Sequence, residues 1–180
     1  DPEVRAKVLE AVAIYRPWLV TIGFPCNRWS PLTNLTIAAG FGESIFRRRS
    51  EHYDFLLLAR DLARMQKDEG RLAILENPLP SQAWRDDPLQ ELLNEGFVLQ
   101  KGHQCEFGLA YYLKQKLIGY HKKATGFLVP EESSLVELLN RICQGDHLHV
   151  PIIGDSKMSK NAGHWPEELA KTMLQGALQD

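Results

Sequence analysis

Apolar residues along this chain fall into two patterns: short, largely apolar runs, and longer stretches in which they recur every three or four positions. Short runs are typical of buried strands, and they occur at 18–24, 71–75, 97–99 and 126–129. Helical spacing marks the stretches that open at Asp1, Ser50, Asp87, Ser134 and Trp165. Because the two patterns alternate, the sequence predicts an α/β fold: a doubly wound, mainly parallel sheet with helices on both faces.

Between Pro31 and Ser50 the periodicity is lost. Two glycines flank Phe41, and three consecutive arginines, residues 47–49, close the segment. The sequence therefore predicts a loop of about 20 residues, a length that inside a compact domain usually belongs to a lid or a binding loop. The arginines have two interpretations here, an ordinary solvated surface or a contact with phosphate.

The length of 180 residues predicts a single domain over 1–180, with a less regular C-terminal extension over 143–180. The net charge of −2 means that any basic surface for nucleic acid must be local. No apolar run approaches the roughly 18 residues of a membrane span, so no membrane partner is expected. Three cysteines, an odd number, argue against a disulfide framework and predict an intracellular protein, nuclear or cytoplasmic. The first residue is Asp and not Met, which suggests a segment of a longer protein.

Two potentially reactive side chains follow predicted strands. Cys26 follows 18–24 and Glu76 follows 71–75, so in a parallel sheet both are expected at the carboxyl edge, where open α/β sheets bind ligands. A thiol and a carboxylic acid facing one cleft suit attack on an electron-poor ring carbon, with proton donation to the ring nitrogen that gains charge. The simpler alternative is a small buried thiol, because free cysteines are commonly interior.

The residues around Cys26 and Glu76 resemble those of the cytosine-5 DNA methyltransferases. Gly23-Phe-Pro-Cys-Asn-Arg-Trp-Ser30 is similar to the family's Gly-x-Pro-Cys-Gln-x-Phe-Ser loop, and Leu75-Glu-Asn-Pro78 is similar to its Glu-Asn-Val motif. The resemblance covers roughly residues 18–130 and implies a Rossmann-like methyltransferase half. It further implies that Cys26 adds to C6 of a flipped-out cytosine, that Glu76 holds and protonates N3, and that S-adenosylmethionine supplies the methyl group.

The sequence departs from the family pattern at three places. Asn27 stands where the family has Gln, Pro78 where it has Val, and Lys122-Lys-Ala-Thr125 where it has a Gln-x-Arg-x-Arg strand. The glycine-rich cofactor loop, which in the family precedes the Pro-Cys motif, is absent from this segment. We therefore expect an incomplete or degenerate domain that binds S-adenosylmethionine weakly or not at all.

The same resemblance implies DNA as the partner, and basic and polar residues near the motifs are its candidate contacts. They are Arg28, Ser30, Arg47, Arg48, Arg49, Lys122 and Lys123. Arg28 has a second expected role, because a positive charge two residues from Cys26 favours the thiolate.

The C-terminal half is similar to a methyltransferase-like segment of retroelement polyproteins through Glu76-Asn-Pro78, Cys105-x-Phe-Gly108, Lys123-x-Thr125 and Cys143-x3-His147-x-His149. The last motif can supply three zinc ligands, with Cys105 or His164 as a fourth. Structural zinc usually uses more closely spaced pairs, so no metal is assigned from the sequence. Two alternatives to methyl transfer stay open. One is a non-catalytic DNA-binding or structural domain of a retroelement polyprotein, and the other is a thiol hydrolase that pairs Cys26 with a histidine.

Overall fold

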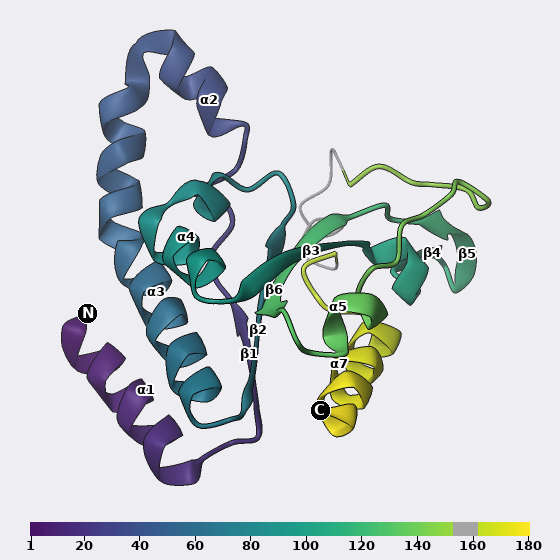
Figure 1. The fold of residues 1–180 in the computed structure, drawn as a ribbon. Coiled ribbons are helices and arrows are strands. Elements are labelled where there is room, and N and C mark those ends of the chain that lie inside the picture. The colour runs from purple at the N-terminus through teal and green to yellow at the C-terminus, as the bar shows by residue number, and fades with distance from the viewer. Residues whose placement is uncertain (153–161) are drawn as a thin grey trace.

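The computed structural model describes residues 1–152 and 162–180, in which a central sheet lies between two groups of helices (Figure 1). The sheet has four strands in the order β1-β2-β6-β3. Their bounds are β1 (Leu19–Gly23), β2 (Leu72–Pro78), β6 (Ala124–Pro130) and β3 (Phe97–His103). Each of the four predicted strands is therefore present, within a few residues of its expected position.

The predicted direction of the strands is wrong. β1 and β2 are parallel, with Gly23 opposite Glu76, but β6 lies between β2 and β3 and is antiparallel to both. The sheet is therefore mixed and not a doubly wound, mainly parallel sheet. The cause is the connection that precedes β6. It contains a short antiparallel hairpin, β4 (Ala110–Leu113) and β5 (Lys116–Tyr120), in place of a crossover helix, so β6 can return beside β3 in the opposite direction.

Helices cover both faces of the sheet, as predicted. One face carries α3 (Gly42–Asp68) and α4 (Asp87–Asn94), and the other carries α5 (Leu135–Leu138) and α7 (Glu167–Gln179). In β2 the side chains alternate between the two layers: Ala73 and Leu75 belong to the core under α3 and α4, whereas Leu72 and Ile74 belong to the core under α5 and α7. Burial on both faces explains why the strand reads as a continuous apolar run.

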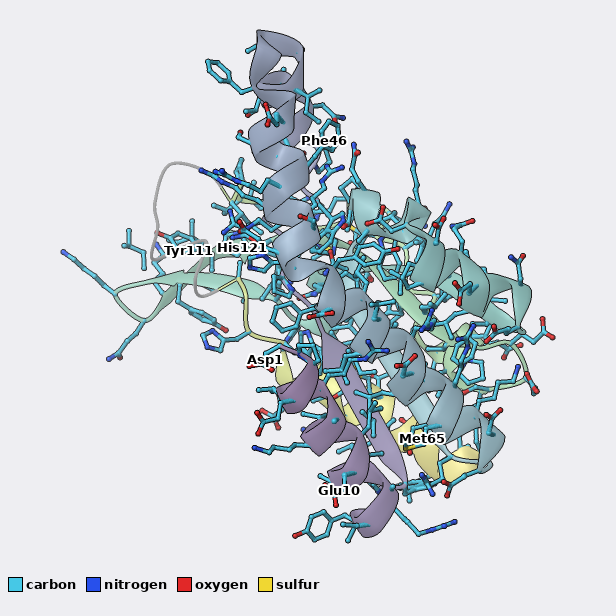
Figure 2. All side chains as sticks on the ribbon, turned by 90° about the vertical axis from the view of Figure 1, so that its left-hand side faces the viewer. Asp1, Glu10, Phe46, Met65, Tyr111 and His121 are labelled. Atoms are coloured by element: carbon cyan, nitrogen blue, oxygen red, sulfur yellow. The ribbon has the colours of Figure 1, made fainter. Side chains whose placement is uncertain are left out.

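The N-terminal helix α1 (Pro2–Tyr15) packs along the outer side of α3 (Figure 2). Its first turn forms as predicted, because the Asp1 carboxylate accepts a hydrogen bond of 2.9 Å from the Glu3 amide. No residue of α1 is fully buried, so polar contacts contribute to its docking. The main one is an ion pair of Arg5 with Asp61 on α3. Burial alone would raise the pKa of Asp61, but hydrogen bonds from Arg5 and Arg60 lower it overall.

The loop predicted between Pro31 and Ser50 is helical in the structure. It contains α2 (Thr33–Thr36) and a π-helical turn, η1 (Ile37–Phe41), before α3 begins at Gly42. Ser50 therefore lies inside α3 and does not cap it. Gly40 has a φ of +89°, which marks the break between the two helical directions. Apolar periodicity is missing because this part of the chain extends beyond the sheet (Figure 1) and leaves residues such as Phe46 largely exposed.

The helix predicted to open at Ser134 does so, but its first turn has no side-chain cap. The Ser134 hydroxyl donates to the Gly176 carbonyl at 3.1 Å, and the Ser134 amide donates to the Asp180 carboxylate at 2.9 Å. The segment consequently docks on α7 and ends after one helical turn instead of reaching Ile142. The final helix, by contrast, begins directly after Trp165-Pro166, as predicted. Across the two described ranges, no helix combines the length and apolar character needed to cross a membrane.

Candidate functional site

The ends of β1 and β2 bring Cys26 and Glu76 to one cleft, as predicted. The two strands are neighbours in parallel register, so the loop that leaves β1 lies beside the last residues of β2. The cleft between them has a volume of about 560 Å³. Its lining includes Cys26, Phe55, Glu76, Asn77, Lys123 and Trp165. Cys26 is exposed, whereas Glu76 is 7% exposed, so the thiol is accessible and the carboxylate lies deeper.

The loop that carries Cys26 is fixed on both sides of the cysteine. Before it, the Phe24 carbonyl accepts a hydrogen bond of 2.8 Å from the buried Asn77 side chain. After it, the completely buried Trp29 donates its indole N–H to Asp86. Burial raises the pKa of Asp86, although the indole hydrogen bond and the charge of Arg49 oppose that rise. Asn77 thus joins the strand end of Glu76 to the loop of Cys26, which explains the use of a Glu-Asn pair at this position.

Glu76 is surrounded by hydrogen-bond donors. Trp165 donates its indole N–H to Oε2 at 3.2 Å, and the Gln104 amide donates to Oε1 at 3.4 Å. The ammonium of Lys123 lies 3.6 Å from Oε1. The cleft therefore contains a largely buried ion pair next to an exposed thiol.

Three of the predicted DNA contacts line a second pocket beside the Cys26 loop. Arg28, Ser30 and Arg48 border this pocket, whose volume is about 370 Å³. Arg28 Nε is buried and has no hydrogen-bond partner within the described part of the chain. A buried N–H without a partner is unusual and costly, and an incoming acceptor such as a phosphate oxygen would satisfy it.

The other predicted DNA contacts lie elsewhere. Arg49 is engaged within the protein, because it donates to the Arg28 carbonyl and to Thr33 Oγ1, both at 3.0 Å. Arg47 is exposed on α3 beside Glu43, away from the second pocket. Lys122 is exposed near His149. The structure therefore brings together two of the predicted basic residues, Arg28 and Arg48, and assigns Lys123 to Glu76.

Comparison of the chain with known proteins gives no match. No protein-family model matches the chain, and neither a curated protein nor a solved structure matches it. The interpretation of the site therefore depends on its own geometry.

The described residues contain no cradle of the kind that holds S-adenosylmethionine by its sugar and backbone. Wherever a strand leads into a helix in residues 1–152 and 162–180, the connection lacks a glycine-rich turn. The described residues therefore do not themselves supply that cradle.

A second group of reactive side chains assembles beside the 3-10 turn that follows β3. Cys105 from η3 (Gln104–Phe107) lies with Cys143, His147 and His149, and their ligand atoms are all within 4.8 Å of one another. Burial raises the pKa of the Cys105 thiol to about 12, and the neighbouring Cys143 thiol adds to the rise. The sequence left Cys105 and His164 as alternatives for the fourth residue of this group, and the structure places Cys105 there.

Sequence reasoning missed two hydrogen-bond partners of Glu76: Gln104, which is buried behind the carboxylate, and Trp165, which lines the cleft. Both reach Glu76 from elements far away along the chain, and neither stands in a motif that would mark it. A partner for the carboxylate could be expected from the rule that buried charges are paired, but its identity could not.

Proposed function

We propose that the cleft holds a cytosine base extruded from DNA, and that Cys26 adds to C6 of this base, as in the base-binding half of a cytosine-5 methyltransferase-like domain. The observation that supports this most is the shared cleft, in which an accessible thiol and a buried carboxylate lie at the ends of adjacent parallel strands. The cleft is also large enough for one pyrimidine, and Phe55 and Trp165 supply aromatic surface against which a base can stack.

The addition needs few groups. The Cys26 thiolate forms a bond from Sγ to C6, and the electron pair of the C5–C6 double bond moves towards C5 and N3. N3 gains negative charge in this step and must receive a proton. The resulting C5 is electron-rich and takes a proton from water. Loss of either C5 hydrogen as a proton to water, followed by expulsion of the Cys26 thiolate and return of the N3 proton to the Lys123–Glu76 pair, restores cytosine. The reaction therefore exchanges the hydrogen at C5 with solvent.

The Lys123–Glu76 pair is the proton source in this proposal. Glu76 in its ionised form accepts a hydrogen bond from the exocyclic amine of cytosine. A proton from the Lys123 ammonium, 3.6 Å from Oε1, then passes through the carboxylate to N3 as the charge develops. Of the three partners of Glu76, Lys123 lies farthest from the carboxylate, at 3.6 Å compared with 3.4 Å for Gln104 and 3.2 Å for Trp165. Lys123 can therefore move without breaking a short hydrogen bond.

The second pocket supports DNA as the macromolecule that delivers the base. Arg28 and Arg48 border it, and the buried Arg28 Nε lacks an acceptor among the described residues. A phosphate beside the extruded nucleotide supplies that acceptor. With a net charge of −2 the chain has little general affinity for DNA, so contacts of this local kind have to carry the binding.

A non-catalytic DNA-binding or structural domain is the second candidate, and one observation favours it. Both oxygens of Glu76 already have donors, a fully satisfied arrangement that is also typical of a structural buried carboxylate. The thiol hydrolase is not supported, because no histidine is among the described residues that line the cleft.

The exchange of the C5 hydrogen distinguishes the two candidates without a methyl donor. The chain is incubated in deuterated water with an oligonucleotide whose single cytosine is mismatched, because a mismatched base costs less to extrude. Deuterium at C5 is then measured by mass spectrometry of the recovered cytosine. We expect exchange with the native chain, none with Cys26→Ser, and a rate lower by about 10² with Glu76→Gln.

Glu43→Gln is the matched control, since this glutamate is exposed on α3 and lies outside the cleft, and its rate should equal that of the native chain. A chain that binds the oligonucleotide but exchanges nothing would favour the non-catalytic candidate. Exchange that survives Cys26→Ser would contradict the role given to the thiol.

A further inference from the structure

We propose that Cys105, Cys143, His147 and His149 form a structural zinc site, with two sulfur and two nitrogen ligands. The inference is independent of the cytosine cleft. It rests on four side chains of the types that zinc prefers, from η3 and from the stretch 143–149, whose ligand atoms all approach within 4.8 Å of one another.

The distances agree with a tetrahedral ion. Cys143 Sγ lies 3.4 Å from His149 Nε2 and 3.7 Å from His147 Nε2. Bonds from zinc of about 2.3 Å to sulfur and about 2.0–2.1 Å to nitrogen, at tetrahedral angles, separate such ligand atoms by about 3.5 Å. The two histidine Nε2 atoms are 3.0 Å apart, slightly closer than about 3.3 Å expected from the same bond lengths. Cys105 Sγ lies within 4.8 Å of the other three ligand atoms, so it approaches by up to about 1 Å to complete the tetrahedron.

The backbone presents the two histidines on one side. Residues 148–150 extend along the edge of β5, where the Tyr120 amide donates to the Leu148 carbonyl at 2.9 Å and the Val150 amide donates to the Tyr120 carbonyl at 2.8 Å. This pairing fixes His149 beside Tyr120. The ring of His147 turns towards it, and the two Nε2 atoms lie 3.0 Å apart.

The surroundings of the ligands fit a bound cation. His147 Nδ1 lies 2.9 Å from the Asp146 carboxylate, a contact that keeps the proton on Nδ1 and leaves the Nε2 lone pair for a metal. The Gly145 amide donates a hydrogen bond of 3.3 Å to Cys143 Sγ, which holds this sulfur in place. Zinc binding would release the two thiol protons to water and place the positive ion between the sulfurs.

Two other interpretations of the cluster are less well supported. Glu106 and Asp146 could join Cys143 and His147 in a site with two carboxylates, but this set leaves out the buried Cys105 and uses an exposed aspartate. Cys105 and Cys143 could instead form a disulfide, but a disulfide would not explain why the Nε2 atoms of His147 and His149 both approach Cys143 Sγ. Four protein ligands fill the tetrahedral shell, so the site has no open position and is structural.

The test uses the whole 180-residue chain, purified under reducing conditions and freed of metal with a chelator. Zinc is added back and counted per chain by native mass spectrometry, and cobalt is added to a second sample. We expect one zinc per chain, and a cobalt spectrum with thiolate charge-transfer bands and the d–d bands of tetrahedral coordination. X-ray absorption of the zinc form should report two sulfur and two nitrogen neighbours.

Variants identify the ligands. Cys105→Ser and Cys143→Ser should each weaken zinc binding by more than 100-fold, whereas Asp146→Asn, which removes a partner of a ligand, should weaken it by about 10-fold. Glu106→Gln and Cys26→Ser are the controls and should bind zinc like the native chain.

Failure of the reduced, folded chain to bind zinc would overturn the proposal. Zinc binding that depends on Glu106 but not on Cys105 would also overturn it. So would a mass that shows a Cys105–Cys143 disulfide in the chain purified under reducing conditions. If a cysteine variant fails to fold, the cobalt spectrum and X-ray absorption of the native chain still decide the ligand set.

Discussion

The two groups of cysteines in this protein lie in opposite environments. Cys26 is exposed at the mouth of an open cleft, whereas Cys105 and Cys143 are buried with two histidines. An accessible thiol beside an ion pair suits a reaction with an incoming molecule, and buried thiols that converge with imidazoles suit a permanent metal. The same residue type thus has two expected uses, and the difference lies in access and neighbours.

The sites also depend on different parts of the fold. The cleft depends on the parallel pair β1 and β2 and on the core under α3 and α4, which holds Trp29. The cluster of Cys105, Cys143, His147 and His149 depends on η3, on the chain after α5 and on the edge of β5. One side chain of η3, Gln104, reaches Glu76, but none of the residues changed below takes part in that contact. We therefore expect changes to one site to leave the other intact, and four predictions test this separation.

The largest effect is expected from Trp29→Ala. Trp29 is completely buried, so its removal should lower the free energy of unfolding by about 3–5 kcal/mol. It should also loosen the Cys26 loop while zinc affinity stays unchanged. Urea denaturation of the zinc-bound chain measures the first effect, and a loss below about 1 kcal/mol would contradict the packing described here.

Zinc should stabilise the folded chain by mass action. At a free zinc concentration 100 times the Kd, the gain in unfolding free energy should be about 2.7 kcal/mol, and it should be absent in Cys143→Ser. Hydrogen exchange should slow most in residues 143–150. An equal slowing throughout α3 would show that the two sites are not separate.

Gly119→Ala tests the pairing that presents the histidines without touching a ligand. A Cβ at Gly119 would lie 2.8 Å from the Leu148 carbonyl oxygen, which must then move. We expect zinc affinity to fall about 10-fold, equivalent to about 1.4 kcal/mol. Gly23→Ala is the matched control, because a Cβ there meets nothing within 4 Å. Unchanged zinc affinity in Gly119→Ala would contradict the role of this pairing.

The smallest effect concerns α1, which is remote from both sites. Because Asp61 has a lower pKa in the folded chain than in the unfolded chain, its contribution is present at neutral pH and is lost as the pH falls below about 4. Asp61→Asn should cost about 1 kcal/mol at pH 7 and nothing at low pH, with both sites unaffected. A variant whose deficit persists at low pH would show that the lost interaction is not electrostatic.

The sequence predicts the shared cleft of Cys26 and Glu76, and for the cluster it names the candidate ligands but leaves the fourth undecided. Cys26 and Glu76 directly follow apolar strands that pair with each other, so local pattern alone places them together. The hairpin of β4 and β5 carries no recognisable turn signal, because Lys114 and Gln115 occupy positive φ positions that usually favour Gly or Asn. Without that hairpin, the antiparallel direction of β6 cannot be foreseen, and the choice between Cys105 and His164 as the fourth member of the cluster stays open.

The helical segment after Cys26 illustrates a further limit. Residues 33–50 form helices whose apolar side chains are largely exposed, such as Leu35 at 71% and Phe41 at 64%. Periodicity reports burial on one face of an element. A helix that extends beyond the core has no buried face, so its sequence lacks apolar periodicity and resembles that of a loop.

The central claim, that the cleft holds a cytosine beside Cys26, is tested most directly by the reactivity of this thiol. The chain is treated with iodoacetamide alone, with an oligonucleotide containing one mismatched cytosine, or with the same oligonucleotide containing thymine, and alkylation of Cys26 is followed by peptide mass spectrometry. At a concentration of cytosine oligonucleotide ten times its Kd, alkylation should slow about 10-fold. The thymine oligonucleotide at the same concentration should protect much less. Equal protection by both, or none by either, would contradict the claim.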